Sequence, residues 1–218
     1  PFGGLGNYLF NPSHVGRAAL LVSFLAQLTT WPKVGQTFAY LDAETGATPL
    51  SIMKQAIKSG DASVLDRLPD FLSLFLGNHP DGAGAMGEIC ALALLLGLAY
   101  MLWKKIITWH IPVSIIVTVF VLAGLMHVVN PVYADPVSVV FSGGLMLGAI
   151  FMATDYVTSP MTHRGQLIYG VAIGTLTVII RNWGAYPEGM SFAILIMNAF
   201  TPLINNYVKP KRFGEVAK

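Results

Sequence analysis

Residues 111–129 read IPVSIIVTVFVLAGLMHVV, a run that contains no Asp, Glu, Lys or Arg. A helix needs about 20 apolar residues to cross the hydrocarbon core of a bilayer. Hydrophobic residues make up 54% of the chain and charged residues only 11%, with a mean hydropathy of +0.62. A soluble domain carries about 25% charged residues. We therefore expect an all-α integral membrane protein.

Other apolar runs extend this pattern over most of the chain. A weaker candidate span covers residues 15–31, which include Arg17 and Gln27. The stronger candidates are residues 86–103, 136–154, 166–183 and 190–208. Several contain glycines, which permit close helix packing or unwound stretches, and packing is the simpler interpretation. We expect residues 1–218 to form a single membrane domain, a polytopic bundle of Gly- and Pro-interrupted helices.

Helix starts are marked by an N-cap residue followed by proline. Asn11-Pro12 and Asp135-Pro136 both fit this pattern, and Glu188 places a carboxylate at the start of the last span. The chain begins with Pro1 and shows no signal-peptide pattern. We expect it to be the later part of a longer protein.

Basic residues alternate between connections. Lys or Arg occurs at 104–105, at 164 and at 209–212, whereas residues 130–135 and 184–189 have neither. By the positive-inside rule, the basic connections and the C-terminus are expected to be cytoplasmic. The connection at residues 32–85 is then extracytoplasmic. Within it, residues 49–67 are expected to form a short amphipathic helix with Ile52, Met53, Ala56 and Ile57 on one face.

A short polar motif lies inside this connection. Thr45-Gly46-Ala47-Thr48 follows Asp42 and precedes Pro49. Small residues with a glycine and a proline are typical of an ordinary turn. The same pattern also resembles the acceptor site at which a flavin transferase attaches FMN to threonine.

Landmarks along nearly the whole chain resemble those of the D subunit of the Rnf complex, a membrane ferredoxin:NAD oxidoreductase. They resemble, more distantly, the B subunit of the sodium-pumping NADH:quinone reductase. The matching stretches are GGLG (3–6), FNP (10–12), VGR (15–17), TGATPL (45–50), FMATD (151–155), VTSPMT (157–162) and YPEG (186–189), with Asn198 and Pro202-Leu203. They occur in the family's order.

The resemblance implies a covalent cofactor. The second threonine of the motif, Thr48, would carry FMN through a phosphoester, and Asp42 matches the acid that opens the transferase recognition motif. The quinone-reductase branch also holds a noncovalent riboflavin, contacted by asparagines near the first helix start. Asn11 matches one of these positions, whereas Tyr8 stands where the other asparagine is expected.

Acidic residues near the spans are candidates for an ion path, because ionisable groups near hydrocarbon are costly. The candidates are Asp135, Asp155 and Glu188. Sodium prefers oxygen ligands, and Asp155 lies close in sequence to Thr154, Thr158 and Ser159. The alternative is structural, with these acids capping helices or pairing with Arg181, Arg164 or a partner subunit.

Several other functions are excluded. The net charge of +2 does not suggest nucleic acid. The single Cys90 cannot form an internal disulfide or hold a four-cysteine cluster. No histidine constellation predicts a metal or haem site.

The resemblance therefore predicts a subunit of an ion-translocating oxidoreductase that relays electrons through FMN, coupled to Na⁺ or H⁺ movement. Its partners would be the other Rnf-type subunits, namely the flavin-carrying G-type, the membrane A- and E-type and the iron–sulfur B- and C-type subunits. It would lie in the inner membrane of a prokaryote with Thr48 outside. One alternative is the B-type protein of the quinone reductase. A second is a redox-silent channel or transporter, since the family's fold is related to urea-channel-like inverted repeats.

Overall fold

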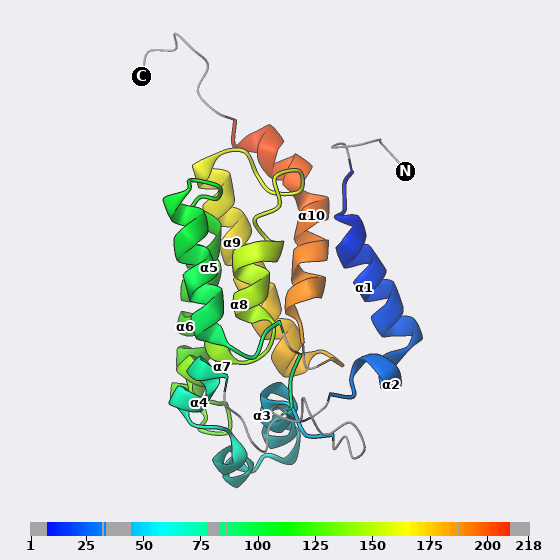
Figure 1. Cartoon of the computed structure of the whole chain (residues 1–218), viewed down its shortest axis with the longest axis vertical. Helices are drawn as coiled ribbons and strands as arrows, with labels where there is room; N and C mark the ends of the chain where they lie inside the picture. The colour runs from blue at the N-terminus through cyan, green and yellow to red at the C-terminus, as the bar shows by residue number, and fades with distance from the viewer. Residues whose placement is uncertain are drawn as a thin grey trace.

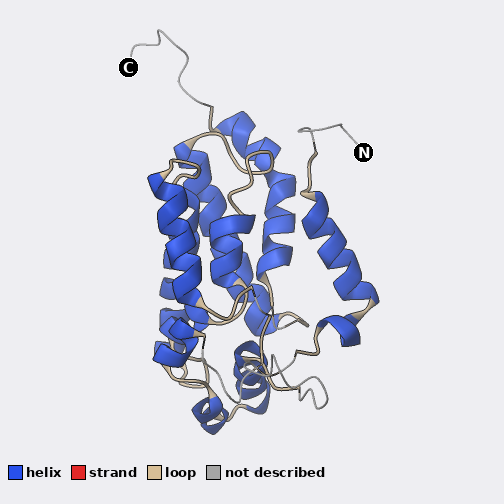
Figure 2. Cartoon of the chain, viewed as in Figure 1, coloured by secondary structure: helices blue, strands red, loops and turns tan. Residues whose placement is uncertain are grey.

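The computed structural model describes residues 8–31, 33, 45–77, 83–85, 87–186 and 188–209, and these ranges are helical without a β-strand (Figures 1 and 2). The all-α prediction is confirmed for them. In chain order the elements are α1 (Pro12–Ser23), α2 (Leu25–Leu28), α3 (Pro49–Ser59), η1 (Ala62–Arg67), α4 (Phe71–Leu76), α5 (Ala91–Trp103), α6 (His110–Val129), α7 (Pro136–Phe141), α8 (Leu145–Leu147), η2 (Gly148–Met152), α9 (His163–Trp183) and α10 (Met190–Tyr207).

The core lies between α6, α9, α10 and the segment from α7 to η2, with Ile115, Ile150 and Ile194 fully buried. Helices α6 and α9 approach very closely. A Cβ atom placed on Gly170 would overlap the Ser114 hydroxyl oxygen, so no larger residue fits here without a shift of one helix. The packing interpretation of this glycine is therefore confirmed.

The span expected at residues 136–154 is broken. Helix α7 ends at Phe141, Gly143 has a left-handed φ of 65°, and the chain resumes as α8 followed by a π-helical turn, η2. The break leaves carbonyl groups without helical partners, and the Arg181 guanidinium donates to two of them, Val139 O at 2.9 Å and Ser142 O at 3.1 Å. The prediction of interrupted helices is confirmed here.

The helices found at the predicted membrane spans differ in length. Among the described residues, α6 is the helix whose length and apolar composition suffice to cross a membrane. The apolar helix α5 is shorter, with 13 residues, because residues 87–90 form a turn ahead of it. The other crossings and the inverted-repeat relationship stay predictions.

The predicted helix starts are confirmed. The Asn11 side chain accepts a hydrogen bond from Ser13 N and the Asp135 side chain one from Val137 N. The amphipathic helix expected over residues 49–67 is shorter than predicted. Gly60 takes a left-handed φ of 70° and ends α3 after Ser59, and a 3₁₀ helix follows.

The connection between α5 and α6, the connection that leads into α9 and the C-terminal end of α10 lie together at one end of the bundle, and α3 lies at the other (Figure 1). Contacts join two of these connections, since Thr108 donates to Gln166 at 2.8 Å and the rings of His110 and His163 stack at 4.3 Å. This arrangement agrees with the alternation of basic loops in the sequence. It places α3, and Thr48 at its start, at the end of the bundle opposite these connections.

Candidate functional site

Thr48 is the N-cap of α3. Its hydroxyl oxygen accepts a hydrogen bond from Ser51 N at 3.2 Å, and its carbonyl accepts one from the Ser51 hydroxyl at 2.7 Å. The side chain is half-buried. A hydroxyl in this position faces the positive end of an 11-residue helix, which favours a bound phosphate.

The backbone of the two residues before Thr48 is hydrogen-bonded to two other segments of the chain. Gly46 N donates to Trp31 O at 3.2 Å, and Ala83 N donates to Ala47 O at 3.3 Å. Thr45 is exposed. Asp42, the remaining residue of the motif, lies outside the described residues. These two backbone hydrogen bonds therefore hold Gly46 and Ala47 in place ahead of α3.

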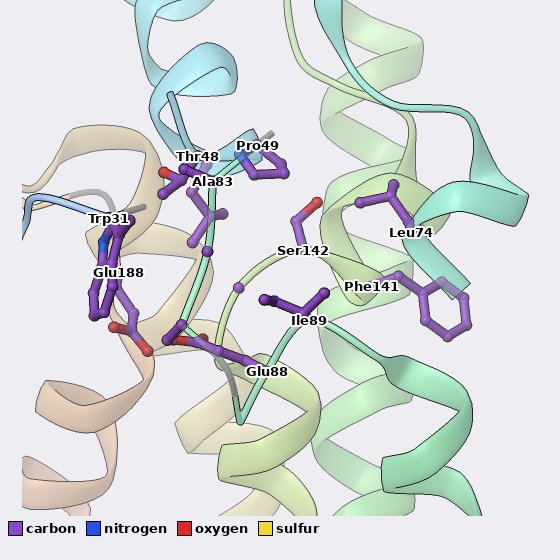
Figure 3. Close-up of a pocket in the computed structure, with 14 residues that line it drawn as sticks. Trp31, Thr48, Pro49, Leu74, Ala83, Glu88, Ile89, Phe141, Ser142 and Glu188 are labelled. Atoms are coloured by element: carbon purple, nitrogen blue, oxygen red, sulfur yellow. The ribbon is translucent and has the colours of Figure 1, made fainter. Parts of the chain in front are cut away.

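Thr48 lies on the wall of a cavity of about 670 Å³, a size usual for sites that bind small molecules. Its wall is formed by residues of α1 and α2 together with residues of the main bundle. Its wall combines aromatic, aliphatic and charged side chains, including Arg17, Leu21, Trp31, Tyr186 and Glu188. A second, smaller cavity adjoins it and also has Thr48, Glu88 and Glu188 on its wall (Figure 3).

Charged side chains meet beside these cavities. Arg17 on α1 forms an ion pair with Glu188, with Nη2 and Oε2 2.7 Å apart. Glu188 was a candidate for the ion path from the sequence, but its pairing with Arg17 was not expected. The carboxylate of Glu88 lies beside Glu188, since oxygens of both would touch a Cβ atom on Gly144.

Lys54 joins α3 to the segment that precedes α10. It is buried, and its ammonium group donates to Gly184 O and to Tyr186 O, the latter at 2.7 Å. Burial and the nearby ammonium of Lys58 lower the pKa of Lys54. This contact ties the helix that begins at Thr48 to the segment that positions Tyr186.

A separate polar group surrounds Asp155. Its Oδ2 atom accepts hydrogen bonds from the Thr158 hydroxyl at 3.0 Å and from the Asn11 amide at 3.3 Å. Thr154 donates instead to Ile150 O. The structure thus brings Asp155 and Asn11 together, whereas Asp135 is an exposed helix cap. The three acids proposed for an ion path do not form one cluster.

Sequence reasoning missed Glu88 and Lys54. Glu88 is the lone carboxylate in the apolar stretch 86–103, which is a signal for a functional group near a membrane. Lys54 lies on the apolar face of an amphipathic helix, where an ammonium group needs acceptors. Neither residue's partners could be inferred without the fold.

A family model described as NQR2, RnfD, RnfE matches residues 1–214. The chain belongs to this family. It is 43% identical over 217 residues to the D subunit of the proton-translocating ferredoxin:NAD(+) oxidoreductase complex of Clostridium ljungdahlii, covering 97% of this chain. It is 43% identical over 213 residues to the D subunit of the Na(+)-translocating ferredoxin:NAD(+) oxidoreductase complex of Acetobacterium woodii, covering 98%.

A third relative is the D subunit of the ion-translocating oxidoreductase complex of Stutzerimonas stutzeri, 38% identical over 238 residues and covering 100% of this chain. The chain spans 63%, 61% and 66% of the lengths of these three relatives, respectively. The resemblance to the D subunit of the Rnf complex, inferred from the sequence landmarks, is confirmed. The relatives differ in the ion that their names give, so the family alone does not select the coupling ion.

Proposed function

We propose that this chain is a membrane subunit of an ion-translocating ferredoxin:NAD oxidoreductase of the Rnf type, with FMN attached to Thr48 through a phosphoester. The observation that supports the attachment is the position of the Thr48 hydroxyl, at the start of α3 and on the wall of a cavity of about 670 Å³. The names of the relatives, all D subunits of ion-translocating oxidoreductase complexes, support the assignment to such a complex.

The residues around Thr48 fit such a group. In the attachment, the Thr48 hydroxyl oxygen would replace the leaving group on the FMN phosphorus and would give up its proton. The phosphate would be held near the positive end of α3, where Ser51 N could donate to it. Trp31 and Tyr186 offer aromatic walls, and the Tyr186 ring is held by stacking on Phe192 at 5.5 Å.

Bound FMN would accept and donate electrons, and the chain's own residues would position it. Partner subunits of the G, A, E, B and C types would supply the neighbouring redox centres, and a flavin transferase would catalyse the attachment. The chain would lie in the inner membrane of a prokaryote, with Thr48 on the extracytoplasmic side and the C-terminus in the cytoplasm. The alternation of basic connections supports this orientation.

Two further assignments accompany this proposal. Asp155 and Glu188 would belong to the ion path, with Asp135 at its edge as a helix cap. Asn11 would contact a noncovalent riboflavin with the amide hydrogen that does not bond to Asp155. Acid extraction of the purified complex, followed by chromatography, tests the second assignment, since a complex free of extractable riboflavin contradicts it.

In-gel fluorescence tests the covalent flavin. The wild-type band from cells that contain the transferase is expected to fluoresce under ultraviolet light after denaturing electrophoresis. Thr48→Ala should abolish the signal. Thr29→Ala is the matched control, because Thr29 lies on the wall of the same cavity but outside the motif. Mass spectrometry should find the FMN adduct on the Thr48 peptide.

A dark wild-type band would contradict the covalent flavin and favour a redox-silent channel or transporter. A fluorescent band in a complex that reduces quinone rather than exchanging electrons between ferredoxin and NAD would favour the B-type subunit of the NADH:quinone reductase. These results separate the three candidate functions.

A further inference from the structure

Two carboxylates converge at the break between α7 and α8. A Cβ atom on Gly144 would overlap Glu188 Oε1 and lie 2.7 Å from Glu88 Oε2. Only a glycine leaves room for both oxygens at this point. Glu88 comes from the turn ahead of α5 and Glu188 from the segment ahead of α10, and the two side chains point toward one another in Figure 3.

The two acids have unequal partners. Glu188 Oε2 accepts from Arg17 at 2.7 Å. Glu88 Oε2 is buried and has no hydrogen-bond partner among the described residues. The other nearby cation is Arg181. Both of its terminal nitrogens donate to carbonyl groups at the C-terminal end of α7, and its Nε has no hydrogen-bond partner among the described residues. One guanidinium therefore pairs with Glu188, and no guanidinium of the described residues forms a hydrogen bond with Glu88 Oε2.

Two ionised carboxylates this close repel one another, and an unpartnered buried charge is costly as well. A proton on Glu88 Oε2 removes both costs, because the oxygen is then neutral and can donate, and Glu188 Oε1 lies against the same glycine as an acceptor. The pair then carries one negative charge, which Arg17 balances. The charged groups that act on Glu88 are Glu188, Arg17 on α1 and Arg181 on α9.

We propose that Glu88 and Glu188 hold one proton between them and exchange it with the redox group at Thr48, an inference that rests on the function proposed above. Glu88, Glu188 and Thr48 lie on the wall of the same cavity (Figure 3). When an iron–sulfur donor in a partner subunit passes one electron to that group, one proton would move from Glu88 Oε2 to the same group. Oxidation of the redox group would pass the electron on to an acceptor subunit and return the proton to Glu88.

Carbodiimide labelling of the complex in native membranes tests the shared proton, because dicyclohexylcarbodiimide reacts with protonated carboxyl groups in apolar surroundings. Peptide mass spectrometry measures the adducts as a function of pH. We expect Glu88 to be labelled at pH 7, where an ordinary glutamate is ionised. Glu188→Gln should reduce this labelling by about ten-fold, because removal of the neighbouring negative charge releases the proton.

Arg17→Gln should act in the opposite direction and extend the labelling of Glu88 to higher pH. Opposite effects of these two variants distinguish a shared proton from a general loss of folding. Asp66→Asn, which removes an exposed acid on η1, should change nothing. The proposal is overturned if Glu88 of the wild-type complex is unlabelled at pH 7, or if Glu188→Gln leaves its labelling unchanged.

A redox titration tests the exchange. Glu88→Gln should make the midpoint potential of the covalent flavin less dependent on pH than in the wild type, and an unchanged slope would overturn this part. Thr48→Ala should lose the flavin and keep the labelling of Glu88. A dark wild-type band with labelled Glu88 would therefore contradict the flavin proposal alone, whereas a fluorescent band with unlabelled Glu88 would contradict the proton pair.

Discussion

The amide nitrogen of Asn11 donates to a carboxylate oxygen of Asp155 at 3.3 Å, across 144 positions of the chain. The other end of the same amide accepts from Ser13 N and begins α1. One side chain thus starts the helix and fastens it to the segment after η2. Arg17, about 9 Å further along α1 at 1.5 Å per residue, fastens the helix again through Glu188.

We expect Asn11→Ala to loosen α1. The variant loses the helix cap and the bond to Asp155, at a cost of about 1–2 kcal/mol in the free energy of unfolding. Asn11→Ser keeps a capping oxygen and should lose less. Thermal unfolding of the purified complex, followed by tryptophan fluorescence, compares the two. An equal loss in both variants would show that the capping oxygen adds nothing.

We expect Gly170→Ala to be destabilising by about 1–3 kcal/mol, because the added methyl group overlaps the Ser114 hydroxyl and forces α6 and α9 apart. Gly16→Ala is the matched control. Gly16 lies in α1 with nothing within 4 Å of an added Cβ atom, so the change should stabilise the helix by about 0.5–1 kcal/mol. Denaturant titration of both variants measures the difference, and equal midpoints would contradict the close packing.

Lys54→Met should release the segment that carries Tyr186. Two carbonyl acceptors, Gly184 O and Tyr186 O, lose a charged donor, which costs about 1.5–3 kcal/mol for each such bond. Limited proteolysis at residues 184–186 should become faster. Lys58→Met removes an exposed ammonium from the same helix and should leave the cleavage rate unchanged. Equal rates in both variants would mean that Lys54 does not hold this segment.

The orientation of the chain can be measured with introduced cysteines. In a Cys90→Ala background, a membrane-impermeant thiol reagent should label Ser59→Cys from outside intact cells and Lys104→Cys only after the cytoplasmic face is opened. Both positions are exposed. Ser59 ends α3 and Lys104 follows α5, and α3 lies at the end of the bundle opposite the connection after α5. The reverse pattern would overturn the topology.

Local signals in the sequence predicted local structure well. Asn11 and Asp135 each stand directly before a proline and cap a helix through their side chains, and the expected span at residues 136–154 breaks next to a glycine, Gly143. The sequence predicts a helix that continues to residue 67, whereas α3 ends at Ser59. In the sequence, a glycine that ends an amphipathic helix looks the same as one that the helix tolerates.

The contacts of the candidate site were less predictable. Arg17 and Glu188 form an ion pair although they are 171 positions apart in the chain, and no periodicity in the sequence predicts such a pair. His110 and His163 begin α6 and α9, and their rings stack although the residues are 53 positions apart. Such contacts depend on the packing of α1 and α9 against the bundle, which local pattern does not encode.

The contact between Arg181 and the carbonyls of α7 has a consequence for biogenesis. Val139 and Ser142 precede their donor by 42 and 39 residues, respectively, so these carbonyls have no partner while α9 is still being synthesised. Unpaired carbonyl groups are costly in lipid. We therefore expect residues 136–154 to insert stably into the bilayer only once α9 has been inserted. The two segments would then leave the translocation machinery together.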